Sequence, residues 1–165
     1  MIAMGKRLTG LALVAGVALA ACGGGGTGSS TVGPGHGSPQ AVLAGLIQVI
    51  QSRNAKSLCQ YFPPSVQKTC ESQISSASVN GLVLQGASIG HAAQQGNRAI
   101  VVLLANKYCS SGGPCYSNHD PNAGLPSGSV TFTSAWTKAL SGNSAKDPAV
   151  AMQLVNGQWY LATAS

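Results

Sequence analysis

The strongest constraint on the fold is a turn signal in the last part of the sequence, Asn156-Gly157. Asn-Gly is the preferred pair for a two-residue β-hairpin turn, because both positions of that turn need positive φ. The turn separates two apolar stretches, residues 149–155 and 158–163. It pairs four apolar side chains across the hairpin and places them on one face: Leu154 with Trp159, and Met152 with Leu161. A chain with this hairpin has to bury one face of an antiparallel sheet.

Strand patterns also occupy the middle of the sequence. Residues 81–93 and 98–108 flank Gln94-Gln95-Gly96-Asn97, which has the composition of a turn. The stretch AIVVLLA, residues 99–105, is apolar at every position rather than at alternate ones. We therefore expect this strand to be covered on both faces.

Helical patterns precede these strands. Ser38-Pro39 predicts a helix start, with Ser as the N-cap and Pro at the first helical position. Apolar residues then recur every three or four positions, and the helix is expected to run to about Arg53. Shorter helices are expected at residues 55–62 and 65–74. Helices followed by antiparallel strands predict an α+β domain, in which N-terminal helices pack on the sheet.

Two later segments have weaker patterns. Residues 110–129 are rich in Gly, Pro, Ser and Asn, which predicts a loop. Residues 134–140 fit a short helix with Ser134 as its cap, or a strand, and the sequence leaves the two open.

The first part of the sequence has the features of an export signal. Lys6 and Arg7 form a positive region, and an apolar stretch follows at residues 11–21. That stretch is shorter than the ~20 residues with which a helix spans a bilayer. Its last residues and the next one, Leu19-Ala20-Ala21-Cys22, resemble the lipobox of bacterial lipoproteins. The resemblance implies cleavage directly before the cysteine, whose thiol is diacylated.

A lipidated cysteine would fix this chain to a membrane. Two acyl chains hold a protein stably on a bilayer, at about 0.8 kcal/mol for each buried CH₂, whereas one chain binds marginally. The Gly- and Ser-rich residues after Cys22 predict a flexible tether. We therefore expect a lipid-anchored protein on the extracytoplasmic face of the cell membrane. Its three parts are a signal peptide at residues 1–21, Cys22 with its tether at residues 22–39, and a folded domain at residues 40–165.

The other four cysteines predict disulfides, because export places them in an oxidising compartment. Their separations along the chain favour two local bridges, Cys59–Cys70 and Cys109–Cys115. Four cysteines allow three connectivities, and the sequence excludes neither of the other two. Zinc is the weaker interpretation, since neither spacing matches the paired C-x₂₋₄-C pattern of zinc sites. We predict no metal and no cofactor.

Composition limits the partners that the chain can have. Only 7% of its residues are charged, and the net charge of +6 includes Lys6 and Arg7 of the expected signal peptide. The other basic residues are scattered, without a run or interleaved aromatic residues, so the sequence does not predict nucleic-acid binding. The expected partners are the membrane, through the anchor, and an envelope protein or an apolar ligand.

The folded domain offers few catalytic groups. His119-Asp120 is an adjacent acid–base pair, but it lies in the expected loop, where we interpret both residues as solvated. His91 lies in an expected strand, and no expected strand carries a carboxylate to orient it. The sequence contains no nucleophile-elbow, zinc-protease or phosphate-loop motif. We therefore predict that the protein is not an enzyme.

The order of elements resembles the NTF2-like superfamily, the cystatin-like cone. The resemblance rests on the long first helix, on the helix that contains Leu58-Cys59, and on LVNGQWYL at residues 154–161. More narrowly, the chain resembles small actinobacterial lipoproteins that carry such a domain behind a Gly/Ser tether. The family implies a curved sheet wrapped on a helix, with a cone-shaped cavity.

Such a cavity leaves three functions open. The first, which the sequence favours, is a non-catalytic binding module of the cell envelope. The second is a carrier of a small apolar or lipid ligand, which a sufficiently large cavity would favour. The third is an isomerase- or cyclase-like enzyme that uses His91 or a tyrosine. The residues expected to line the cavity are Leu46, Ile50, Leu84, His91, Val102, Met152, Leu154 and Trp159.

Overall fold

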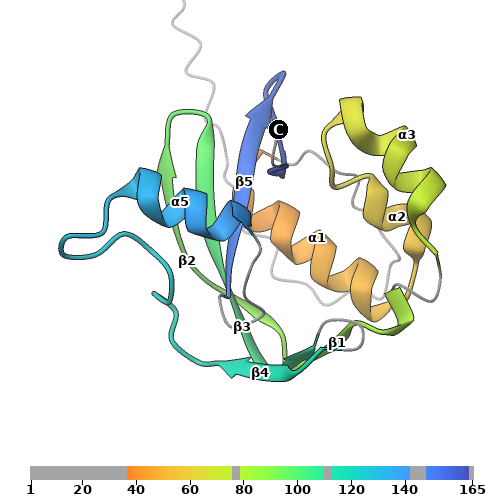
Figure 1. The fold of residues 1–165 in the computed structure, drawn as a ribbon, viewed down its shortest axis with the longest axis horizontal. Coiled ribbons are helices and arrows are strands. Elements are labelled where there is room, and N and C mark those ends of the chain that lie inside the picture. The colour runs from red at the N-terminus through yellow and green to blue at the C-terminus, as the bar shows by residue number, and fades with distance from the viewer. Residues whose placement is uncertain (1–36, 76–78, 110–112, 142–147, 164–165) are drawn as a thin grey trace, which may run out of the picture. The chain divides into compact units, whose positions relative to one another are not determined.

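The computed structural model describes residues 37–75, 79–109, 113–141 and 148–163. All of them belong to one of the two units into which the chain divides, Thr31–Ser165. The expected signal peptide, Cys22 and all but the last residues of the tether lie outside the described residues. The described part is an α+β domain with helices packed on a curved antiparallel sheet, as the sequence predicted (Figure 1).

Three helices come first in this domain: α1 (Pro39–Gln51), α2 (Ala55–Cys59) and α3 (Pro64–Gln73). Ser38 caps α1 as predicted, because its side-chain oxygen accepts a hydrogen bond from the N–H of Ala41. Asn54 caps α2 in the same way, through the N–H of Ser57. The starts of α1 and α2 are therefore set by local polar side chains, whereas α3 begins after Pro63 without a side-chain cap.

The sheet is built around one long strand, β3 (Arg98–Cys109), which has neighbours on both sides. The other strands are β1 (Val83–Gln85), β2 (Ser88–Gln95), β4 (Cys115–Asn118), β5 (Ala149–Val155) and β6 (Gln158–Leu161). Strands β2 and β5 flank the first half of β3, and β1 and β4 flank its second half. Strand β6 pairs with β5, and every pairing is antiparallel.

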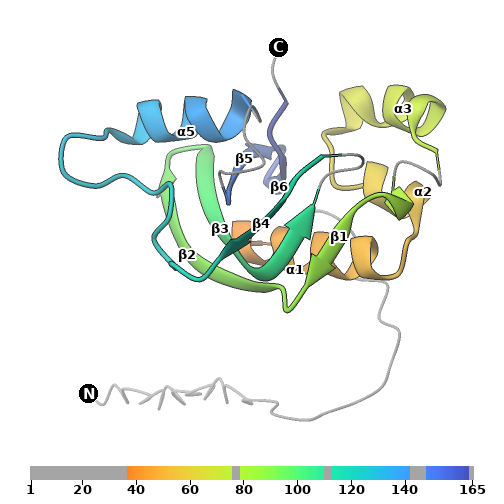
Figure 2. The ribbon, with the colours of Figure 1, turned by 60° about the horizontal axis from the view of Figure 1, so that its bottom comes forward.

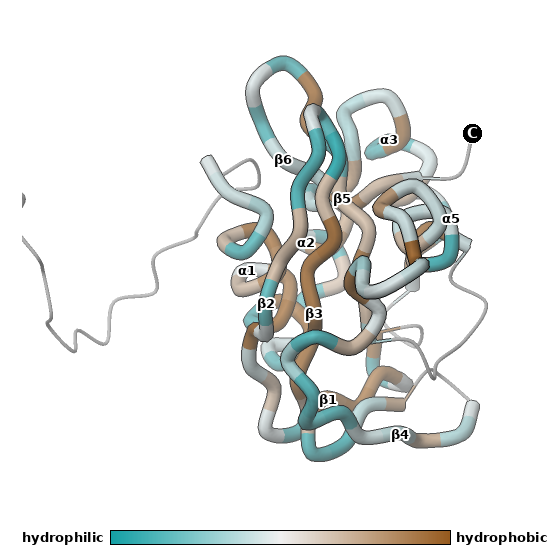
Figure 3. The backbone as a smooth tube through the Cα atoms, turned by 90° about the vertical axis from the view of Figure 1, so that its left-hand side faces the viewer, coloured by the Kyte–Doolittle hydropathy of each residue, from teal (hydrophilic) through white to brown (hydrophobic). Residues whose placement is uncertain are grey.

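Helices cover both faces of the sheet. Helix α1 lies on one face, and α5 (Phe132–Ser141) lies on the other (Figures 1 and 2). Alternate residues of β3 supply the two cores: Val101 packs with α1, whereas Ile100 packs with Trp136 of α5. Figure 3 shows the apolar colour along β3 between these layers. The unbroken apolar run predicted this double coverage.

The β5–β6 hairpin has the predicted turn and register. Asn156 and Gly157 have φ values of 51° and 78°, both in the region that the Asn-Gly turn requires. The cross-strand pairs are the predicted ones: Leu154 with Trp159, and Met152 with Leu161. These side chains belong to the cluster that packs on α1.

The strand expected at residues 81–93 is divided into β1 and β2 at Gly86. Gly86 has φ +59°, and a Cβ atom there would collide with the side-chain amide of Asn106. Only glycine meets both conditions without strain. In Figure 2, β1 and β2 meet at a sharp bend, so this glycine turns the edge of the sheet.

Two other expectations differ from the structure. Strand β4 lies within residues 110–129, which were expected to form a loop. Residues 134–140 belong to helix α5, which begins two residues before Ser134. Thr131 caps this helix in place of Ser134, since its hydroxyl oxygen accepts the N–H of Ser134 at 3.2 Å.

Both disulfides are local, with the pairing that the spacing favoured. Cys59 bonds to Cys70 and joins α2 to α3, whereas Cys109 bonds to Cys115 and joins β3 to β4. The second bridge spans the paired ends of two neighbouring strands.

Candidate functional site

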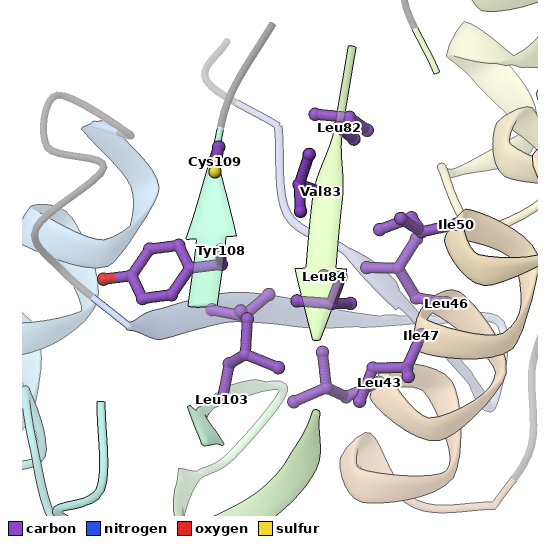
Figure 4. Close-up of a pocket in the computed structure, with 11 residues that line it drawn as sticks. Leu43, Leu46, Ile47, Ile50, Leu82, Val83, Leu84, Leu103, Tyr108 and Cys109 are labelled. Atoms are coloured by element: carbon purple, nitrogen blue, oxygen red, sulfur yellow. The ribbon is translucent and has the colours of Figure 1, made fainter. Parts of the chain in front are cut away.

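A cavity of about 230 Å³ lies between α1, β1 and the second half of β3. Figure 4 shows Leu46 and Ile50 extending from α1 toward Leu84 of β1. The lining has one hydroxyl group, that of Tyr108, and no charged side chain. The lining residues are Leu43, Leu46, Ile47, Ile50, Leu82, Val83, Leu84, Leu103, Tyr108, Cys109 and Val150.

Helical periodicity builds one wall of this cavity. Leu43, Leu46, Ile47 and Ile50 recur at spacings of three and four, so they share one face of α1. Leu43 is 1% exposed, whereas Ile50 is only partly buried. The wall therefore runs from the core of the domain toward its surface.

A second depression, of about 220 Å³, adjoins the surface end of the cavity. The two share the lining residues Ile50, Leu82, Val83 and Leu84. The rest of the second lining is polar and comes from Gln51, Arg53, Asn80 and Gln85. An apolar chamber thus continues into a polar depression, and neither lining contains a carboxylate.

Three of the eight residues expected to line a cavity do so: Leu46, Ile50 and Leu84. Met152, Leu154 and Trp159 belong instead to the packed cluster between α1 and the sheet. Met152 and Trp159 are 0% and 4% exposed, so their side chains fill the space under the β5–β6 hairpin. The cavity is confined to the end of the domain where β1 lies.

Val102 and His91 were also expected in the lining, and the structure places both elsewhere. Val102 alternates with Leu103 along β3, so when Leu103 faces the cavity Val102 faces away from it. His91 lies at a register shift of β2, where the ladder with β3 is interrupted. The backbone N–H of His91 donates to the carbonyl oxygen of Pro121 at 2.9 Å, and the ring Nδ1 lies 2.9 Å from Asn122 Oδ1. The bulge therefore aims this exposed histidine at the loop after β4.

The His119-Asp120 pair also lies outside the cavity lining. Asp120 Oδ1 accepts the N–H of Asn122 at 2.9 Å, and the N–H of Asp120 donates to Asn118 Oδ1 at 3.2 Å. The carboxylate therefore orders a turn rather than orienting a catalytic base. Within the described parts of the chain, no three potential metal ligands come together.

Sequence reasoning missed most of the lining outside α1. Leu82 and Val83 lay within an expected strand, but strand alternation would place them on opposite faces. The run Leu82-Val83-Leu84 is apolar at consecutive positions, and this was the available signal that both faces are covered. Cys109 was assigned only to a disulfide, and Arg53 only to a helix end. The place of Cys109 at the cavity and that of Arg53 at the polar depression depend on how distant elements pack.

Comparison with known proteins gives little further guidance. No known family and no curated protein matches the sequence. A solved structure with a similar arrangement is the solution structure of a SEC-C motif containing protein from Rhodopseudomonas palustris. It is 13% identical, the match covers 78% of this chain and 80% of that chain, and the TM-score is 0.44. A likeness of this degree carries no inference about function.

None of the helices in the described ranges combines the length and the apolar character that crossing a bilayer requires.

Proposed function

We propose that this protein binds a small apolar ligand in the cavity between α1, β1 and β3, without catalysing a reaction. The observation that carries the proposal is this cavity of about 230 Å³, whose lining is apolar apart from the hydroxyl of Tyr108 and which opens toward the surface. An apolar cavity of about 150 Å³ stays dry and takes up benzene. The present cavity is open to solvent at one end, but its lining offers water few polar partners, so an alkyl chain or a small ring can displace that water at little cost in hydrogen bonds.

Burial of the ligand would supply the affinity. Each CH₂ transferred from water to apolar surroundings contributes about 0.8 kcal/mol, so a chain of about eight carbons gains about 6 kcal/mol. The loss of translational and rotational freedom opposes this gain. A gain of 6 kcal/mol alone corresponds to a dissociation constant of about 40 µM, so a simple alkyl ligand should bind more weakly than this.

Among the three functions that the sequence left open, the ligand carrier draws the most support from the site. An isomerase-like reaction needs a base in the cavity beside a second polar group, but His91 faces the loop after β4. The hydroxyl of Tyr108 does line the cavity, and the lining adds no second polar side chain to it. The membrane anchor at Cys22 is a separate part of the proposal. It would hold the binding domain at the extracytoplasmic face of the membrane, where apolar molecules partition.

The test is calorimetric titration of the full chain with 1-octanol. Cys22→Ala is introduced so that no acyl chain or detergent competes for the site. Two variants fill the cavity from different strands, Leu103→Phe from β3 and Val150→Leu from β5. The matched control is Val130→Phe, which adds apolar surface at a residue that is 45% exposed and outside the lining.

We expect saturable binding of one octanol in the parent and in Val130→Phe. Each filling variant that retains the parent's circular dichroism spectrum should bind at least tenfold more weakly. Absence of saturable binding in the parent would overturn the proposal. Equal binding in the parent and both folded filling variants would place the ligand outside the cavity and would overturn it as well.

A further inference from the structure

Arg53 occupies a backbone position at which glycine is the preferred residue. It directly follows Ser52, the C-cap of α1, and has φ 56°. The N–H of Arg53 donates to Ile50 O at 3.1 Å, and the N–H of Asn54 donates to Val49 O at 3.3 Å. These two hydrogen bonds define a Schellman motif, whose left-handed residue is usually Gly.

A side chain at this position has a conformational cost. The left-handed region costs an L-residue with a Cβ atom roughly 1–2 kcal/mol, and arginine has no short polar group that would offset this locally. A residue held in such a region points to a role for its side chain. A favourable interaction with the C-terminal end of α1 is one candidate, and it would operate without any ligand.

The surroundings of Arg53 favour a second role. Arg53 is exposed and lines the polar depression that continues from the apolar cavity. Asn80 and Gln85 line the same depression and carry amide N–H donors. Lys107 stands directly opposite Gln85 in the β1–β3 ladder, so a second cation lies one strand away. None of the described carboxylates forms an ion pair with Arg53 or lines the depression.

We infer that the ligand is a single-chain amphiphile with an acidic head group, and that Arg53 binds this head. The inference rests on the proposed function, because the alkyl chain fills the apolar cavity. The head then lies in the polar depression, which Arg53, Asn80 and Gln85 line. A guanidinium presents paired N–H donors that suit a carboxylate or a phosphate.

The experiment compares three probes with the same alkyl chain: octanoate, octyl phosphate and 1-octanol. All are titrated by calorimetry into the full chain carrying Cys22→Ala. We expect both acidic probes to bind more tightly than octanol, by roughly three- to tenfold at low salt. This advantage should shrink as salt is raised, because the depression is exposed to solvent. The acidic probe that binds more tightly identifies the head as carboxylate or phosphate.

Three variants separate a ligand role from a role in helix capping. Arg53→Gly should abolish the preference for acidic probes, leave octanol binding unchanged, and raise the melting temperature through relief of backbone strain. Arg53→Lys should keep most of the preference. Lys68→Gln, which removes one positive charge from α3 away from both linings, should change none of these values.

The outcomes distinguish the two proposals. Failure of all three probes to bind would overturn the proposed function together with this inference. Saturable binding of octanol, with acidic probes no tighter or with their advantage intact in Arg53→Gly, would overturn only the assignment of an acidic head to Arg53.

Discussion

At the scale of single residues, Tyr61 joins the helical layer to the sheet. Its side chain is 2% exposed and lies against Gly45 of α1, where a Cβ atom would collide with the tyrosine hydroxyl. Its backbone carbonyl accepts the N–H of Leu161 in β6 at 2.8 Å. One residue between α2 and α3 thus contacts both α1 and the edge of the sheet.

This burial predicts a loss of stability at high pH. Desolvation raises the pKa of Tyr61 above the usual value of 10.0, because burial disfavours the charged phenolate. As the pH rises past 10, the unfolded chain releases this proton while the folded chain retains it. Tyr61 thus contributes full stability below pH 10, and the contribution declines as the pH rises through the folded pKa.

Urea unfolding from pH 8 to pH 11 measures this dependence. The free energy of unfolding of the wild type should fall more steeply above pH 10 than that of Tyr61→Phe, which has no phenol to titrate. If the free energies of unfolding of the two proteins fell in parallel with pH, the pKa of Tyr61 would be the same in the folded and the unfolded chain.

At the scale of elements, a helix or strand can be predicted from the sequence when the interactions that form it lie between residues close together in the chain. The β5–β6 hairpin follows from two turn residues and their neighbours, so its register was predictable. The start of α1 follows from Ser38-Pro39 in the same way. Strand β4 has only four residues and forms because β3 and the Cys109–Cys115 bridge hold it, which no local pattern records. The bend at Gly86 depends on Asn106 of a neighbouring strand.

The two disulfides join different elements and should have separable effects. Cys59–Cys70 links α2 to α3, whereas Cys109 also lines the cavity. From the chain-entropy model, replacing both cysteines of a pair by alanine should cost about 3 kcal/mol for the first bridge and about 2 kcal/mol for the second. Only Cys109→Ala/Cys115→Ala should also weaken octanol binding, because it frees one wall of the cavity.

Urea unfolding and calorimetric titration of the two double variants provide both readouts. If Cys59→Ala/Cys70→Ala weakened octanol binding as much as the other pair, α2 and α3 would be shaping the cavity from a distance.

At the scale of the whole domain, β3 contributes side chains to two cores, which lie on opposite faces of the sheet. Ala99 and Val101 belong to the α1 core, whereas Ile100 belongs to the α5 core with Trp136. The guanidinium of Arg98 lies 4.4 Å from the centroid of the Trp136 ring, which adds a cation–π contact on the α5 side. The cavity belongs to the α1 side. The family resemblance led us to expect a cavity, but its position could not be read from the sequence, because it lies where large side chains such as Met152 and Trp159 do not reach.

The separation of the two cores predicts that stability and ligand binding can be changed independently. Ile100→Val removes one methylene from the α5 core and should cost about 0.5–1.5 kcal/mol of unfolding free energy. Octanol at ten times its dissociation constant should stabilise the parent by about 1.4 kcal/mol, because it binds the folded state alone. Ile100→Val should gain the same increment, since its cavity is intact, whereas Leu103→Phe should gain almost none. Urea unfolding with and without octanol measures all three. A reduced increment in Ile100→Val would mean that strain crosses β3 from one core to the other, and the two faces would then have to be treated as a single packing unit.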